Sequence, residues 1–234
     1  MSGRSPRWIS IAPMIGTLRV GSVVKLNLNS TPWDWLVVHQ GLPSDMYDES
    51  CDGTWLLLKD IYETRAWNST KSNILESSTI HNYLNGDFQN LFDPTIQKSI
   101  RQVKIPYRQN GGDRGTDQSG ANGLQTKAFL LSEYEMGFTT SDNSYIPVDG
   151  AKLDYFENGE STFANGKRIA YLNGTASIWW SRSPTKSGDE YVWGVADTGE
   201  HYNKGNIVTV SRGIRPAIIL PSDFRISADL ITAA

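Results

Sequence analysis

The chain has 234 residues, a formal net charge of −3 and 38 % hydrophobic residues, which is enough apolar material for one substantial folded domain. The charge balance shows no basic stripe, which argues against a sequence-independent nucleic-acid binder. The single cysteine, Cys51, excludes an internal disulfide and fits synthesis in a reducing cytoplasm.

The first twenty residues predict no secretion signal, because Ser10, Pro13 and Gly16 interrupt any continuous apolar stretch. No apolar run in the chain is long enough to span a bilayer. Residues 1–20 are rich in arginine and show little periodicity. They indicate either a disordered terminus or an attachment arm that folds on a partner, and we expect a single globular domain over residues 21–234.

Strand patterns open the expected domain. Residues 22–28 alternate polar and apolar side chains, and residues 33–39 form a run of β-branched and aromatic side chains. Residues 55–59 are a third strand candidate, while residues 128–131 and 217–220 are short apolar runs typical of buried strands. These patterns predict small antiparallel sheets.

Two helices are predicted between the strands. Ser78 or Thr79 can cap the first, and Asp93 followed by Pro94 is a typical start for the second. The apolar stripes are Ile80, Tyr83, Leu84 and Phe88 in the first helix, and Ile96, Ile100 and Val103 in the second. No segment after residue 145 has the length of a third long helix.

Residues 107–127 contain five glycines and almost no apolar side chains, which predicts a long exposed loop. Its glycine-rich part lacks the Gly-Lys-Ser/Thr ending of a phosphate-binding loop. Just beyond it, Ser132 followed three residues later by Glu135 is a weak capping-box signal for a short turn.

Catalytic and metal-binding patterns are missing from the sequence. The histidines, His39, His81 and His201, are far apart and stand in no zinc-binding spacing. There is no Gly-x-Ser-x-Gly motif of the kind that presents a nucleophilic serine. We therefore predict no catalytic residue, no metal and no cofactor.

Two pairs of acidic residues have the composition of an acid and base pair. They are Glu133 with Glu135 and Asp189 with Glu190. Acids in such loop-like contexts are usually solvated surface charges, and we expect both pairs to be exposed.

The segment from residue 178 to residue 220 is the most informative. Trp179 and Trp180 are consecutive, so in a strand their rings face opposite sides, and both are interpreted as packing residues. Arg182 and Arg215 are each embedded in apolar and turn sequence. We interpret these arginines as framework residues that hydrogen-bond loop carbonyls and carboxylates or stack on a tryptophan, in preference to ligand binding.

Residues 185–206 lie between these motifs and combine aromatic rings with polar side chains, a mixture that adaptable binding loops use. An ordinary polar hairpin is the alternative interpretation. The predicted ligand-binding residues are Tyr191, Trp193, Asp197, Glu200, His201, Tyr202, Asn203 and Asn206.

The motif Trp-Trp-x-Arg-Ser-Pro at residues 179–184, followed by Gly-Ile-Arg-Pro-Ala at residues 213–217, resembles an uncharacterised domain family of gut bacteria and their phages. Residues 33–41, 53–60 and 128–135 also fit, so the resemblance covers roughly residues 20–221. The family looks related to the formylglycine-generating-enzyme branch of the C-type lectin fold. The resemblance thus implies an α+β, C-type-lectin-like single domain with small antiparallel sheets, two helices and long loops.

The chain departs from those relatives in two respects. Formylglycine-generating enzymes depend on a pair of cysteines, whereas this chain has only Cys51, so that activity is not expected. Many lectin-fold domains bind calcium, but the acids within residues 189–200 match no calcium motif.

The resemblance and the absent catalytic motifs together favour a non-catalytic bacteriophage virion protein. Its arm would contact other virion proteins, and its domain would bind a host-surface or mucosal glycan or protein, without nucleic-acid binding or membrane insertion. A homotrimer is considered by analogy with phage fibres, although no heptad repeat supports it. The alternatives are a purely structural virion component, such as a capsid decoration or baseplate protein, and a carbohydrate-active enzyme.

Overall fold

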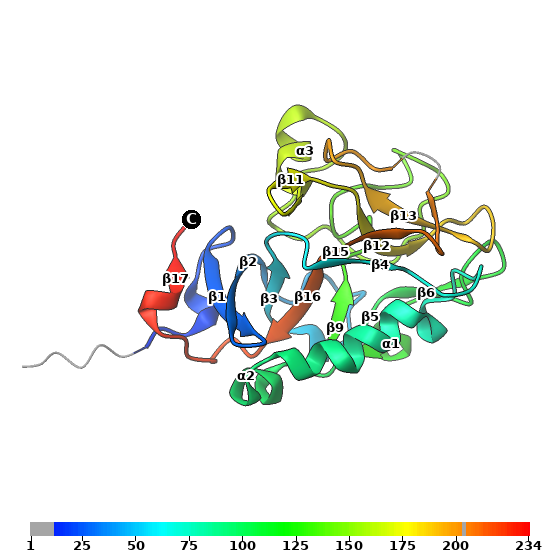
Figure 1. Ribbon diagram of the computed structural model, residues 1–234. Helices are drawn as coiled ribbons and strands as arrows, with labels where there is room; N and C mark the ends of the chain where they lie inside the picture. The colour runs from blue at the N-terminus through cyan, green and yellow to red at the C-terminus, as the bar shows by residue number, and fades with distance from the viewer. Residues whose placement is uncertain (1–11, 203–204) are drawn as a thin grey trace, which may run out of the picture.

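The structure, a computed structural model, describes residues 12–202 and 205–234. Figure 1 shows a mixed helix and sheet architecture in which strands dominate and the few helices are short. The α+β class predicted from the sequence is therefore confirmed. The number of helices differs, because a third short helix, α3 (Thr162–Arg168), follows the region in which no long helix is expected.

The largest sheet has six strands, and every pairing in it is antiparallel. Asn29 and Ser30 both have positive φ and form the two-residue turn of its first hairpin, which matches the right-handed twist of the flanking strands. In sheet order the strands are β17 (Ile231–Thr232), β1 (Val23–Leu28), β2 (Thr31–Gly41), β3 (Gly53–Leu58), β16 (Pro216–Leu220) and β9 (Ala128–Leu130).

Both faces of this sheet are buried. In β2, Trp35 and Val37 belong to one hydrophobic cluster, whereas Leu36 and Val38 belong to another on the opposite face. The same alternation continues in β3 and β16, as the two-residue period of a strand requires. Figure 1 shows α1 and α2 along one face of the sheet, and residues 131–170 supply part of the second cluster.

A second sheet of five strands carries the motif at residues 179–184 and the start of the motif at residues 213–217, which continues into β16 of the six-stranded sheet. In sheet order it comprises β14 (Asn206–Ile207), β13 (Tyr191–Val195), β12 (Trp179–Pro184), β15 (Ser211–Ile214) and β4 (Glu63–Ala66). Only β12 and β15 pair in parallel. Trp179 and Trp180 are both fully buried, and they pack into different clusters.

Three two-stranded ladders complete the sheet structure of the described residues. They are β5 (Val103–Ile105) with β8 (Leu124–Thr126), β6 (Tyr107–Gln109) with β7 (Thr116–Gln118), and β10 (Tyr171–Leu172) with β11 (Thr175–Ala176). Three of these strands fall within residues 107–127, where the sequence predicts an exposed loop. The prediction of a loop is wrong for these strands, because polar strands can pair with each other, whereas the non-glycine residues between them are exposed as expected. Buried glycines let the segment pack closely: the Gly112 N–H donates to Asn73 Oδ1 at 2.9 Å.

The predicted helix starts are observed, but the helices end early. Helix α1 (Thr79–Asn85) is capped by the Ser78 hydroxyl, which accepts from the His81 N–H. Phe88 lies in a following 3₁₀ turn, Asp87–Leu91. Helix α2 (Pro94–Ser99) begins after Asp93, whose carboxylate accepts from Asn27 and makes no cap bond. Val103, predicted on the second helix, lies in β5.

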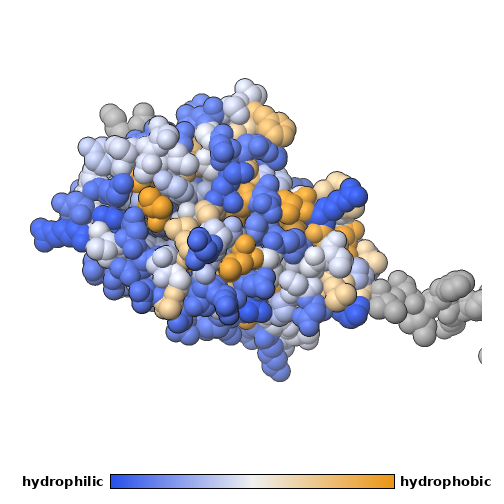
Figure 2. Space-filling model, turned by 180° about the vertical axis from the view of Figure 1, so that it is seen from behind, coloured by the Kyte–Doolittle hydropathy of each residue, from blue (hydrophilic) through white to orange (hydrophobic). Residues whose placement is uncertain are grey.

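The folded part also begins earlier than predicted. Ile15 is fully buried in the first hydrophobic cluster, and the Gly16 N–H donates to the Ser222 carbonyl at 2.9 Å. Residues 12–20 therefore pack on the domain, and the part of the predicted arm within residues 1–11 lies outside the described residues. Seen from behind the view of Figure 1, the surface of the molecule is mostly hydrophilic, with apolar side chains in small groups (Figure 2).

Candidate functional site

Two members of the predicted binding loop are structural. Trp193 is only 1 % exposed, and its indole N–H donates to the Tyr145 carbonyl at 3.3 Å. Asn206 is 4 % exposed and accepts from Arg212 Nε at 3.1 Å. Both lie in strands of the five-stranded sheet, where neighbouring segments cover their side chains. The prediction that they contact an external ligand is therefore wrong.

The remaining loop residues differ in burial and in their contacts. His201 packs between the edges of Phe138 and Trp193, at centroid distances of 5.6 and 5.7 Å, and its Nδ1 lies 2.8 Å from Glu160 Oε1. Asp197 and Glu200 are exposed, whereas Tyr191 and Tyr202 are partly buried. Asn203 lies outside the described residues.

Arg182 is 1 % exposed and binds four segments of the chain. Its guanidinium forms a two-bonded pair with the Glu135 carboxylate, at 2.5 and 2.7 Å. The same group donates to the carbonyls of Pro106 at 3.1 Å, Leu130 at 3.0 Å and Asp149 at 2.8 Å. Carbonyls that no sheet ladder satisfies thus receive their hydrogen bonds from one buried cation.

Arg215 has a similar bracing position. Its Nε donates to the Leu58 carbonyl at 2.8 Å, and its guanidinium lies 5.0 Å from the centre of the Trp179 ring. Because Arg215 is fully enclosed, burial lowers its pKa to about 10. The framework residues of the two sequence motifs therefore contact one another across the fold.

Glu133 and Glu135 are fully buried, so the prediction that they are solvated is wrong. The cause is local. The Ser132 N–H donates to the Glu135 carboxylate at 2.9 Å, and the Glu135 N–H donates to the Ser132 hydroxyl at 3.1 Å, the reciprocal bonds of a capping box. The turn positions the Glu135 carboxylate, which Arg182 neutralises, whereas the Glu133 carboxylate has no ion-pair partner among the described residues.

Glu133 and Asp149 are buried acids whose carboxylate oxygens have no hydrogen-bond partner among the described residues. Desolvation by burial is the main cause that raises the pKa of Glu133 to about 8 and that of Asp149 to about 7. Both acids thus retain protons at pH values where exposed carboxyl groups have lost them. Their enclosure keeps them from any ligand outside the protein.

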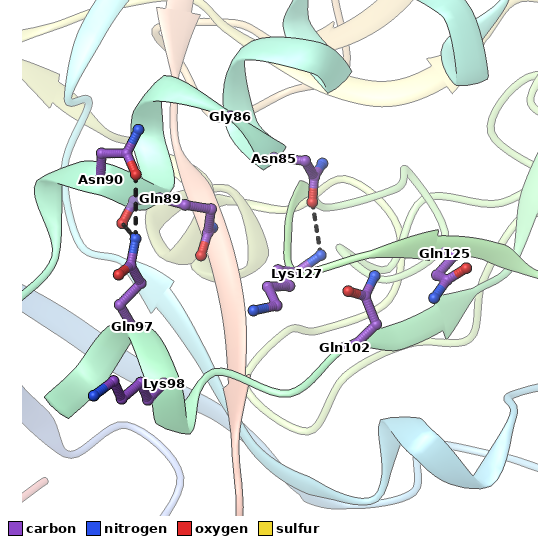
Figure 3. Close-up of a pocket in the computed structure, with 9 residues that line it drawn as sticks. All are labelled: Asn85, Gly86, Gln89, Asn90, Gln97, Lys98, Gln102, Gln125 and Lys127. Carbon is purple, nitrogen blue, oxygen red and sulfur yellow. Dashed lines mark hydrogen bonds between the residues drawn. The ribbon is translucent and has the colours of Figure 1, made fainter. Parts of the chain in front are cut away.

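The described residues form a pocket of 480 Å³ on the helix side of the fold. Figure 3 shows that its side chains come from the end of α1, the following 3₁₀ turn, α2, the segment before β5, and β8 with the residue after it. The lining residues are Asn85, Gly86, Gln89, Asn90, Gln97, Lys98, Gln102, Gln125 and Lys127. Six of these nine carry carboxamides, and none is acidic.

Part of the lining is held rigidly. Asn85 Oδ1 accepts from the Lys127 N–H at 2.7 Å and from the Thr126 hydroxyl at 3.0 Å, which fastens α1 to the segment between β8 and β9. Gln97 Nε2 donates to the Gln89 carbonyl at 2.8 Å. These bonds leave the walls in place without a ligand.

Other lining groups are free to bind. The side chains of Gln102, Gln125, Lys98 and Lys127 have no hydrogen-bond or ion-pair partner within residues 12–202 and 205–234. The pocket therefore offers both donors and acceptors.

The sequence does not reveal this pocket. Its residues span positions 85–127, and each has an ordinary interpretation as a polar side chain on a helix or in a loop. A signal exists only in the recurrence of Asn and Gln in this stretch. Folding brings the carboxamides together because Asn85 binds the segment after β8, a contact that no local pattern predicts.

Within the described part of the chain, no group of three or more His, Cys, Asp or Glu side chains is placed to hold a metal ion. Among the helices described, none is long and apolar enough to cross a membrane.

Residues 52–222 match the family model described as Domain of unknown function (DUF6273). The match covers more than half of the chain, and the chain belongs to this family. No curated protein and no solved structure matches it.

The buried acids predict how stability depends on pH. The unfolded chain releases the Glu133 proton near the ordinary pKa of 4.5, whereas the folded chain keeps it up to about 8. The stability that this group contributes is therefore complete below pH 4.5 and is lost as the pH rises towards 8.

We expect Glu133→Gln to lose less stability than the wild type between these pH values, measured by urea unfolding. Glu157→Gln, at a partly exposed acid, is the control, and equal slopes in Glu133→Gln and the wild type would contradict the assignment.

Removal of the Arg182 guanidinium should leave the buried Glu135 carboxylate without its ion-pair partner. We expect Arg182→Met to lower the free energy of unfolding by about 3–5 kcal/mol. The double variant Arg182→Met/Glu135→Gln should be destabilised by less than the sum of the single changes, because no unpaired charge remains. Additive effects in denaturant unfolding would argue against a direct Arg182–Glu135 coupling.

Proposed function

We propose that this DUF6273 domain is a non-catalytic binding domain that takes a hydroxyl-rich ligand, a glycan, into the carboxamide-lined pocket. One observation carries the proposal: six carboxamide side chains from several elements line a single pocket of 480 Å³. That volume lies within the range typical of small-molecule sites.

Carboxamides suit the hydroxyl groups of a sugar. Each amide has two N–H donors and a carbonyl acceptor, so it can bind a hydroxyl as donor or as acceptor. Gln102 and Gln125 have both kinds of group free among the described residues. Amides also do not titrate near neutral pH, so these side chains bind a ligand without acting as acid or base.

The pocket is largely formed before binding. The bonds of Asn85 and Gln97 fix the lining, and Gln89 Nε2 donates to the Leu84 carbonyl at 3.2 Å. A site whose walls are already ordered loses less conformational entropy when the ligand binds. This organisation supports a recognition role for the pocket.

The wider proposal places the domain on a phage particle, with a C-type-lectin-like fold, a host-surface or mucosal glycan as ligand and residues 1–11 as part of the attachment to other virion proteins. A trimeric assembly belongs to the same proposal. The resemblance of residues 179–184 and 213–217 to phage-associated domains supports it. The pocket, and not residues 185–206, is the surface that we assign to the ligand.

A glycan array with the purified chain tests the binding role. We expect a glycan ligand whose affinity falls about tenfold or more in Gln102→Ala/Gln125→Ala, because several hydrogen bonds are lost. Gln109→Ala, at an exposed glutamine outside the pocket, is the matched control and should bind normally. Titration calorimetry gives the affinities.

Binding that is unchanged in the double variant would contradict the pocket assignment. The absence of any glycan ligand, together with electron microscopy of particles in which the pocket is buried between subunits, would favour a purely structural virion component.

A further inference from the structure

Resting on the proposed function, we infer that the glycan is anionic and that Lys127, assisted by Lys98, binds its acidic group. The charge of the lining is the first reason. Its only charged residues are these two lysines, so the site is positive in a chain whose formal net charge is −3. A glycan that carries a carboxylate or sulfate group complements such a site.

The pairing of lysines within the described residues is the second reason. Lys25, Lys59, Lys71 and Lys167 have acidic partners within 4 Å, and Lys104 and Lys152 donate to carbonyls. Lys98, Lys127 and Lys186 have no such partner among these residues, and two of the three line the pocket. An unpaired ammonium beside a pocket is free to bind a ligand anion.

The backbone places Lys127 well for this contact. Its N–H is held by Asn85 Oδ1 at 2.7 Å, between β8 and β9, and the residue is only partly exposed. Figure 3 shows the Lys127 side chain extending towards the middle of the pocket, with Lys98 at one edge. Lys127 is therefore the main anion-binding residue, and Lys98 strengthens the local positive potential.

Calorimetric titrations with a neutral oligogalactan, an oligogalacturonate and a sulfated oligogalactan test the inference. We expect the wild type to bind at least one of the two acidic ligands about tenfold more tightly than the neutral one, with a preference that weakens as salt increases. Lys98→Gln/Lys127→Gln should remove this preference but retain binding to the neutral ligand. Lys186→Gln, which removes an unpaired lysine outside the pocket, should leave it unchanged. The two acidic ligands distinguish a carboxylate from a sulfate.

Equal affinities for neutral and acidic ligands, or a preference that survives in Lys98→Gln/Lys127→Gln, would overturn the inference. The proposed function would still stand if Gln102→Ala/Gln125→Ala weakened binding of all ligands. If that glutamine variant bound every ligand as the wild type does, or if the wild type bound none, the proposed function would fail as well.

Discussion

A guanidinium that leaves water must find acceptors for its N–H groups, or its burial is costly. Arg182 finds them in the Glu135 carboxylate and in the carbonyls of Pro106, Leu130 and Asp149. These segments are distant in sequence and make little regular structure together. The buried cation therefore joins the five-stranded sheet to the irregular segments around it, and the rest of the fold depends on that junction.

The same junction positions the pocket. Pro106 directly follows β5, and Leu130 ends β9, so Arg182 holds both ends of the wall that carries Gln102, Gln125 and Lys127. Asn85 then fastens this wall to α1. The conspicuous sequence motif is thus framework, while the groups available to a ligand lie on elements that the framework supports.

Local patterns in the sequence predict much of the fold but little of the site. The alternation in residues 22–28, the cap at Ser78 and the opposite-facing Trp179 and Trp180 are governed by short-range geometry and are observed. Burial of Glu133 and Trp193 depends on segments that pack over them from elsewhere in the chain. From the sequence alone, polar side chains are therefore expected on the surface, and aromatic side chains in a loop are expected to bind a ligand.

The central claim is that recognition occurs at the carboxamide pocket and not at residues 185–206. It is tested most directly by nuclear magnetic resonance of the isotope-labelled chain during titration with the glycan that binds it. We predict shifts in the side-chain amide signals of Asn85, Gln102 and Gln125. Shifts confined to residues 185–206, with the pocket amides unchanged, would contradict the account.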